Sequence, residues 1–218
     1  MAKKRTRIRY TQNDIDNFFE WGINLKNRII YLSSISSDVE GREEGVNYEM
    51  AEYAIKGLAL MGNTKRRITI LMNNIGGDWF HGMAIYDAIR RTQYHAPVDI
   101  EVYGHAMSMG AVILQAGRKR LMHPNSALMI HDGRIGRDRD MHVRDAENWG
   151  KYESKMCDRM YDIFAERSGH YRSFWKKRCS RDTILTPEET VDWGLADGII
   201  ESTKALPCVK RKRIDRKK

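Results

Sequence analysis

Apolar residues in the middle of the chain follow two alternating periodicities. Short β-rich runs occur at residues 29–32, 68–72, 98–102, 127–130 and 199–200. Apolar positions at three- and four-residue spacing predict helices at 51–61, around 85–89 and at 109–116. Strand, turn and helix recurring in this way predict an α/β fold of parallel strands with crossover helices, whose functional loops lie at the carboxyl ends of the strands.

Polar and glycine-containing segments separate these elements. The strand at 68–72 runs into Asn73-Asn-Ile-Gly-Gly77, which is typical of a turn. Gly104 is expected to begin another turn after the strand at 98–102, and the Glu- and Gly-containing segment 36–47 is predicted to be a loop.

A long amphipathic helix is predicted at about residues 146–167, after a polar connection that begins at Arg134. Its apolar stripe recurs at helical spacing and comprises Trp149, Tyr152, Met156, Met160, Ile163 and Phe164. Such a stripe packs either on the chain's own core or on another subunit. Further on, Thr186-Pro-Glu-Glu189 predicts a capped helix that ends at Gly194.

Length and composition indicate one domain without a membrane span. The chain has 218 residues, and no stretch contains the roughly 18 consecutive apolar residues that a spanning helix needs. The basic start is followed by no apolar run typical of a secretory signal. Cys157, Cys179 and Cys208 lack metal-ligand spacing, which favours reduced thiols and a cytoplasmic location.

The net charge of +9 is concentrated at the two ends of the chain. Residues 1–9 carry five Lys and Arg residues, and residues 204–218 carry eight against Asp215. Removing these ends from the totals of 38 basic and 29 acidic residues leaves 25 and 28, a net charge of −3. Solvated tails explain this distribution better than a nucleic-acid-binding surface on the folded part does.

Ser108 is the first candidate for chemistry. It lies at a predicted strand-to-helix turn, where free backbone N–H groups and the helix dipole favour developing negative charge. That placement suits a nucleophile, although a serine there also serves as an ordinary helix cap.

His131 is the candidate base for such a serine. It directly follows the apolar run 127–130, so its ring is expected at a strand end, as a catalytic base or as a core residue. A base of this kind needs a carboxylate to orient it, and the residues alone single out none. Gly76 and Gly77 let backbone N–H groups approach a substrate carbonyl and fit acyl transfer better than phosphate binding.

Five motifs occur in order along residues 25–201. They are Asn73-Asn-Ile-Gly-Gly77, Gly82-Met-Ala-Ile-Tyr-Asp87, Gly104-His-Ala-Met-Ser-Met-Gly-Ala111, Pro124-Asn-Ser with Leu128-Met-Ile-His131, and Arg181-Asp182 with the segment from Leu185 to Asp197. Together they resemble the proteolytic subunit of the ATP-dependent Clp protease, the ClpP family. Ile75 and Asp132-Gly133 depart from the family's pattern, which has proline and Gln-Pro at these places.

The resemblance implies a fold and a domain organisation. The fold is the α/β ClpP/crotonase type, built of stacked β-β-α units with a protruding handle helix. Residues 1–24 are then a basic divergent N-terminal segment, 25–203 a serine peptidase domain with its handle at about 134–170, and 204–218 a basic tail expected to be disordered.

The resemblance also implies the site and its chemistry. Ser108 is similar to the family's nucleophile, His131 to its general base and acid, and Asp182 to the carboxylate that orients the histidine. The backbone N–H groups of Gly77 and Met109 correspond to the oxyanion hole. The substrate is then an unfolded peptide that adds as a strand beside the segments after Gly77 and after His131.

The same resemblance implies partners. A homo-oligomer is expected, as a heptameric ring and as two rings stacked through their handles into a tetradecamer. A partner AAA+ unfoldase would use ATP, whereas this chain would bind no cofactor, metal, membrane or nucleic acid. Two alternatives are a crotonase-type acyl-CoA enzyme, which would not need all three side chains, and a non-catalytic scaffold or nucleic-acid-binding relative.

Overall fold

The computed structural model describes residues 9–33, 35–36, 43–133 and 142–201. Its helices and strands follow in this order: α1 (Gln12–Trp21), β1 (Ile23–Asn24), β2 (Ile29–Ser33), β3 (Ile35–Ser36), β4 (Glu43–Glu44), α2 (Tyr48–Met61), β5 (Ile68–Asn74), α3 (Trp79–Thr92), β6 (Val98–Met107), α4 (Met109–Leu114), β7 (Arg120–Met122), β8 (Ala127–Ile130), α5 (Val143–Ser168), α6 (Arg172–Cys179), β9 (Thr183–Leu185), α7 (Pro187–Asp192) and β10 (Gly198–Ile199). The tail predicted to be disordered and most of the polar connection before α5 lie outside the described residues.

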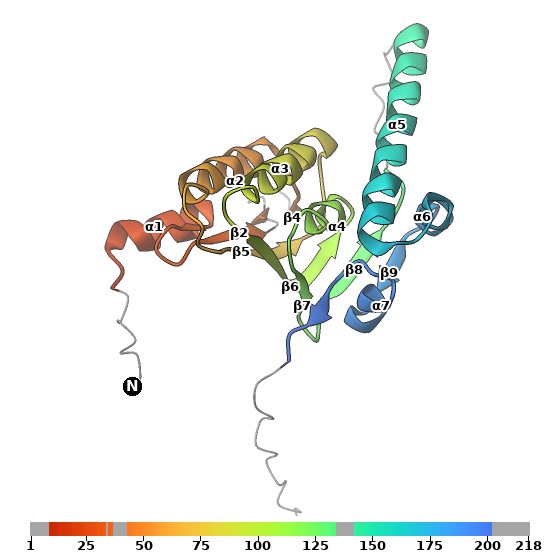
Figure 1. Cartoon of the computed structure of the whole chain (residues 1–218). Coiled ribbons are helices and arrows are strands. Elements are labelled where there is room, and N and C mark those ends of the chain that lie inside the picture. Colours follow the sequence, from red (N-terminus) through yellow and green to blue (C-terminus); the bar gives the residue numbers. More distant parts are fainter. Residues whose placement is uncertain (1–8, 34, 37–42, 134–141, 202–218) are drawn as a thin grey trace, which may run out of the picture.

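A mostly parallel sheet forms the centre of the molecule (Figure 1). Its main path runs β1-β2-β5-β6-β7-β10, and every pairing from β2 to β10 along it is parallel. The helices α2 and α3 lie side by side over one face of this sheet. The predicted α/β fold is therefore confirmed, and the crossover helices bring the carboxyl ends of β5, β6 and β8 to one edge.

Strand β6 differs from its prediction. The expected turn at Gly104 is wrong, because the strand continues to Met107. Gly104 has a φ of 41°, and a Cβ there would lie 2.4 Å from the side-chain oxygen of Asn73. At this glycine β6 exchanges one neighbour for another, since its earlier residues pair with β7 and its later residues pair with β8.

Helix α2 follows its predicted apolar spacing with one exception. Ala51, Ala54, Leu58 and Met61 are buried, whereas Ile55 of the same predicted set is exposed. The helix also begins earlier than expected, because the side chain of Asn47 accepts a hydrogen bond from the backbone N–H of Met50 and caps it. Burial of one face of α2 against the sheet supports the strand ends that carry the site.

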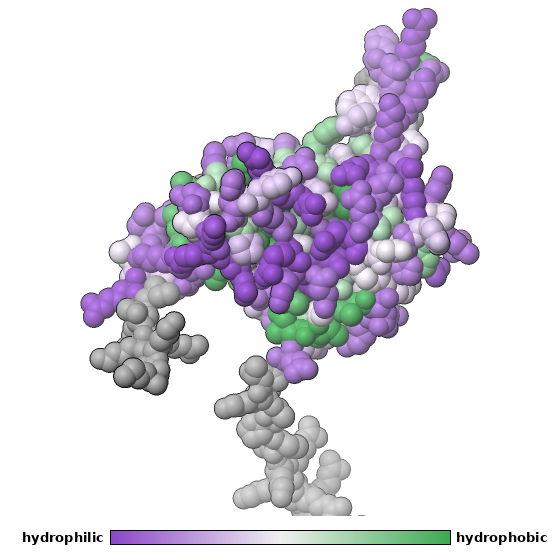
Figure 2. Space-filling view, in the orientation of Figure 1, coloured by the Kyte–Doolittle hydropathy of each residue, from purple (hydrophilic) through white to green (hydrophobic). Residues whose placement is uncertain are grey.

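The predicted long helix is α5, and its apolar stripe divides into two parts. Met160, Ile163 and Phe164 are buried in the core, whereas Trp149 and Tyr152 are about 45% and 42% exposed. Figure 1 shows α5 projecting beyond the rest of the molecule. On the side seen in Figure 2 this projecting part is mainly hydrophilic.

The C-terminal elements agree closely with the sequence pattern. Thr186 and Glu189 form the predicted capping box at the start of α7. Helix α4 ends at Leu114, two residues earlier than expected, and Gln115 is its C-cap residue. The last strand, expected at 199–200, lies at Gly198–Ile199. No helix in the described part of the chain is both apolar and long enough to span a bilayer.

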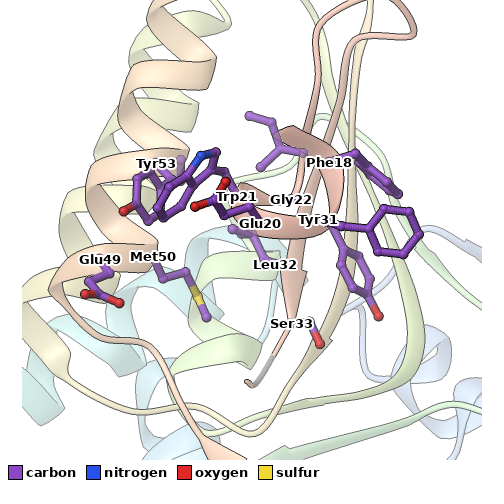
Figure 3. A pocket seen from close by; sticks show the side chains of 13 residues that line it. Phe18, Glu20, Trp21, Gly22, Tyr31, Leu32, Ser33, Glu49, Met50 and Tyr53 are labelled. Atoms are coloured by element: carbon purple, nitrogen blue, oxygen red, sulfur yellow. The ribbon is translucent and has the colours of Figure 1, made fainter. Parts of the chain in front are cut away.

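The elements absent from the prediction are mostly short or lie near the N-terminus. Helix α1 begins at Gln12, after the cap residue Thr11, whose side chain forms a capping box with Asp14, and β1 pairs antiparallel with β2. A pocket of about 210 Å³ lies between α1, β2 and α2, where Trp21 packs against Tyr53 (Figure 3). None of the predicted catalytic residues lines this pocket.

Candidate active site

Ser108 occupies a strained turn between β6 and α4. Its φ of 50° and ψ of −117° lie outside the regions that non-glycine residues ordinarily adopt. Its side chain makes no capping hydrogen bond to the helix, so the simple cap interpretation does not hold. Its backbone N–H donates to the carbonyl of Met129 at 2.8 Å, which ties the turn to β8. Strain held in place by surrounding structure is a common property of functional residues.

The register of β8 beside β6 brings His131 to this serine. Met107 pairs with Met129, so Ser108 and His131 both lie just beyond the paired ends of their strands. The Nε2 atom of His131 lies 2.8 Å from Oγ of Ser108, within hydrogen-bond distance. The imidazole is 13% exposed and is thus largely shielded from solvent.

Asp182 reaches the other ring nitrogen of His131. It immediately precedes β9, whose Thr183 pairs antiparallel with Ile130, so the register places Asp182 opposite His131. One carboxylate oxygen lies 3.4 Å from Nδ1, which is longer than the roughly 3 Å of a typical hydrogen bond. The Asp182 side chain is about half exposed. The three predicted side chains therefore converge, with a tighter contact at the serine than at the aspartate.

The glycine turn after β5 lies against Ser108. Gly76 has a φ of 104°, and a Cβ on it would lie 2.6 Å from Cβ of Ser108 and 3.0 Å from the backbone nitrogen of Met109. Gly77 has a φ of 138° and bridges to Val46 in parallel fashion. Only glycine accommodates both the positive φ and this close approach.

Asn74 is a residue of this turn that the sequence analysis did not single out. It is about 1% exposed, and its side-chain oxygen accepts a hydrogen bond from the N–H of Gly76 at 2.8 Å. Its side-chain nitrogen contacts the sulfur of Met50 at 3.5 Å. Asparagine directly before a glycine turn commonly forms such a local bond, so the signal was present in the sequence.

The cysteines of the described chain are poor competitors for the role of nucleophile. Burial, with smaller contributions from the nearby Asp132 and Cys157, raises the pKa of the Cys179 thiol to about 12. Burial also raises the pKa of Cys157, although a backbone hydrogen bond from Gly133 opposes this. A thiol must ionise to attack, so a raised pKa disfavours both as nucleophiles at neutral pH. Among the described residues, no group of three or more His, Cys, Asp and Glu side chains is arranged to hold a metal.

A strained serine at a strand-to-helix turn, a histidine in contact with it and a carboxylate behind the histidine define a serine hydrolase type of site. Comparison with known proteins agrees with this class. A family model described as Clp protease matches residues 25–203. The ATP-dependent Clp protease proteolytic subunit of Deinococcus radiodurans is 33% identical over 184 residues, which cover 83% of each chain.

A second relative supports the same assignment. The ATP-dependent Clp protease proteolytic subunit 1 of Chlamydia abortus is 34% identical over 174 residues, covering 75% of this chain and 86% of that protein. The chain belongs to the Clp protease family, a family of serine peptidases.

Proposed function

We propose that this chain is a serine endopeptidase that hydrolyses unfolded polypeptides through an acyl-enzyme on Ser108. The observation that carries the proposal is the 2.8 Å contact between Oγ of Ser108 and Nε2 of His131, with Asp182 at the opposite ring nitrogen. An unassisted hydroxyl is a weak nucleophile at neutral pH, and a neighbouring imidazole that accepts its proton removes this limitation.

The reaction then proceeds in two halves. Oγ of Ser108 attacks the peptide carbonyl carbon while Nε2 of His131 takes the hydroxyl proton, and the same proton passes to the leaving amine as the C–N bond breaks. Water next attacks the ester, with His131 again accepting and returning a proton, so that Ser108 is regenerated. Asp182 holds the imidazole in the tautomer whose Nε2 is free to accept and stabilises the imidazolium.

The backbone N–H groups of Gly77 and Met109 are proposed to stabilise the oxyanion. Met109 is the first residue of α4, where helix N–H groups have no partner within the helix. Val46 bonds to the residues on either side of Gly77. Its N–H donates to the carbonyl of Gly76 at 2.5 Å, and its carbonyl accepts from the N–H of Asp78 at 2.8 Å. The N–H and C=O of Gly77 therefore point away from Val46, as the alternation of an extended strand requires.

This orientation also supports strand-like binding of the substrate. A peptide that pairs with the free side of Gly77 would be recognised mainly through its backbone, with little dependence on side chains. Such recognition suits a peptidase that acts on unfolded chains.

We further propose assembly into a heptameric ring, two rings stacked into a tetradecamer through α5, and supply of substrate by an ATP-using AAA+ unfoldase. Both relatives are named as proteolytic subunits of ATP-dependent proteases, and the exposed Trp149 and Tyr152 on α5 provide an apolar surface for contact between copies. We propose no cofactor or metal for this chain and a cytoplasmic location. A mass measurement in solution tests the assembly, and a particle that stays monomeric at micromolar concentration would contradict it.

The catalytic proposal is tested by peptide hydrolysis. Ser108→Ala is expected to abolish cleavage of an unstructured fluorogenic peptide, whereas Ser154→Ala, which removes an exposed hydroxyl on α5, is expected to cleave at the wild-type rate. Cleavage by Ser108→Ala at the wild-type rate would overturn the proposal. The convergence of all three side chains, which an acyl-CoA enzyme of this fold or a non-catalytic relative does not require, favours the peptidase over both alternatives.

A further inference from the structure

The two residues that follow His131 are fixed by helices α5 and α6. The backbone N–H of Asp132 donates to the carbonyl of Cys179, the last residue of α6, at 2.6 Å. One carboxylate oxygen of Asp132 accepts a hydrogen bond from the hydroxyl of Tyr161 on α5 at 2.5 Å. The backbone N–H of Gly133 donates to the thiol of Cys157, also on α5. Three contacts thus hold a segment of two residues.

The contacts from α5 come from one face of the helix. Cys157 and Tyr161 are four residues apart and so lie one above the other on its surface. Tyr161 is about 3% exposed, so its ring is fixed by the packing around it. Burial raises the pKa of Tyr161 far above its usual range, and the bond to Asp132 raises it further. The hydroxyl therefore keeps its proton at neutral pH and remains a hydrogen-bond donor to the carboxylate.

This segment matters because the paired strand ends just before His131. Strand β8 ends at Ile130, and the ladder with β9 ends at the pair Ile130 and Thr183. The backbone after His131 is therefore held by the contacts of Asp132 and Gly133, together with the side-chain contacts of the histidine itself. A displacement of about 1 Å at a catalytic group can lower a rate by about 100-fold.

Asp132 does not replace Asp182 as the partner of the imidazole. Its carboxylate is bonded to the phenol of Tyr161, whereas Nδ1 of His131 faces Asp182 and Nε2 faces Ser108. Any effect of Asp132 on the reaction therefore passes through the position of its neighbour in the chain.

We infer that Asp132 and Tyr161 are positioning residues for His131: the hydrogen bond between them fixes the imidazole against Ser108 and makes correct seating of α5 a condition for acylation. The inference rests on the proposed triad. It also assigns a role to Asp132, which departs from the family's pattern at this place. The helix that projects from the molecule is thereby connected to the proton transfer through the hydrogen bond between Tyr161 and Asp132.

The test removes the bond from each side and measures the rate of Ser108 labelling by a small fluorophosphonate, which needs no peptide-binding strand. Tyr161→Phe keeps the ring and deletes the hydroxyl, and Asp132→Ala deletes the acceptor. Each is expected to lower the labelling rate constant about 10- to 100-fold. The double variant is expected to be no slower than the slower single variant, because both changes remove one interaction.

Two further variants distinguish positioning from a general loss of structure. In Asp132→Asn the amide oxygen still accepts from Tyr161, so the labelling rate is expected to return to within about threefold of wild type. Tyr94→Phe removes a highly exposed hydroxyl that lies after α3, away from this segment, and is expected to label at the wild-type rate. Thermal unfolding of every variant is followed in parallel, so that rates are compared between folded proteins.

Several outcomes would overturn the inference. Labelling of Tyr161→Phe at the wild-type rate would do so, as would additive losses in the double variant or an Asp132→Asn variant as slow as Asp132→Ala. Failure of the proposed function looks different, because the wild-type chain itself would then remain unlabelled.

Discussion

The turn that carries Ser108 (the catalytic turn) and the part of α5 that carries Trp149 and Tyr152 (the outer part of α5) differ in how far their side chains are exposed to solvent. Around Ser108, short contacts connect residues from three strand ends, and His131 is largely shielded. Along the outer part of α5, Trp149 and Tyr152 have large exposed faces, and the ring of Tyr152 contacts the rings of Trp149 and Phe80. The first arrangement brings its three side chains together within one chain, whereas the second leaves exposed apolar area that suits the proposed contact between copies.

The largest expected effect comes from removing His131, the residue that lies between Ser108 and Asp182. His131→Ala removes the group that accepts the serine proton, so kcat/KM for a peptide is expected to fall about 10⁶-fold. Because the imidazole packs at a strand end and not within the core, the unfolding temperature and the particle mass are expected to stay close to wild type. Cleavage within tenfold of wild type would show that another base serves Ser108.

The next effect concerns the inner part of α5. Phe164 is fully buried and packs against Trp175 with ring centroids 5.5 Å apart. Phe164→Ala leaves a cavity and is expected to lower the free energy of unfolding by about 3–5 kcal/mol. Denaturant unfolding of the purified chain measures this, and a loss below about 1 kcal/mol would place Phe164 outside the core.

Gly76→Ala alters the catalytic turn without removing a catalytic group. The new methyl would lie 2.6 Å from Cβ of Ser108, on a backbone whose φ of 104° disfavours any side chain. The expected result is a loss of about 100-fold in kcat/KM, because Ser108 must move away from His131. Gly198→Ala is the matched control, since a Cβ at Gly198 would make only an ordinary contact, at 3.9 Å, with the side chain of Leu121. Equal activities for the two variants would contradict the close approach of the glycine turn.

The smallest effect tests the outer part of α5. Trp149→Ala is expected to change the unfolding free energy of an isolated chain by no more than about 0.5 kcal/mol, since the side chain is half exposed. The same variant is expected to shift the particle mass toward smaller species. An unchanged particle mass together with a large loss in unfolding free energy would show that Trp149 stabilises the chain itself and does not contribute to assembly.

Local signals explain what the sequence predicted correctly. Strand and helix periodicity located β2, β5, β8 and α5. The turn positions of Ser108 and His131 made both residues candidates, whereas their roles as nucleophile and base followed from the family resemblance. The box at Thr186 predicted α7 because its hydrogen bonds lie within four residues. The similar box at Thr11 and Asp14 was equally local but was not recognised, so α1 was missed.

The rest depended on contacts between distant parts of the chain. Asp182 was expected from the family resemblance alone. It reaches His131 because β9 pairs with β8, and the three residues of β9 carry too little pattern to predict a strand. Gly104 looked like a turn because the exchange of strand partners at that point is invisible in the sequence. The bond between Tyr161 and Asp132 spans 29 positions and has no local signal.

The most direct test of the account is to identify the residue that a fluorophosphonate modifies. After incubation of the intact protein, mass spectrometry is expected to show one adduct per chain, and peptide mapping is expected to place it on Ser108. Chains that carry no adduct after prolonged incubation, or an adduct on a residue other than Ser108, would contradict the claim that His131 and Asp182 make this hydroxyl a nucleophile.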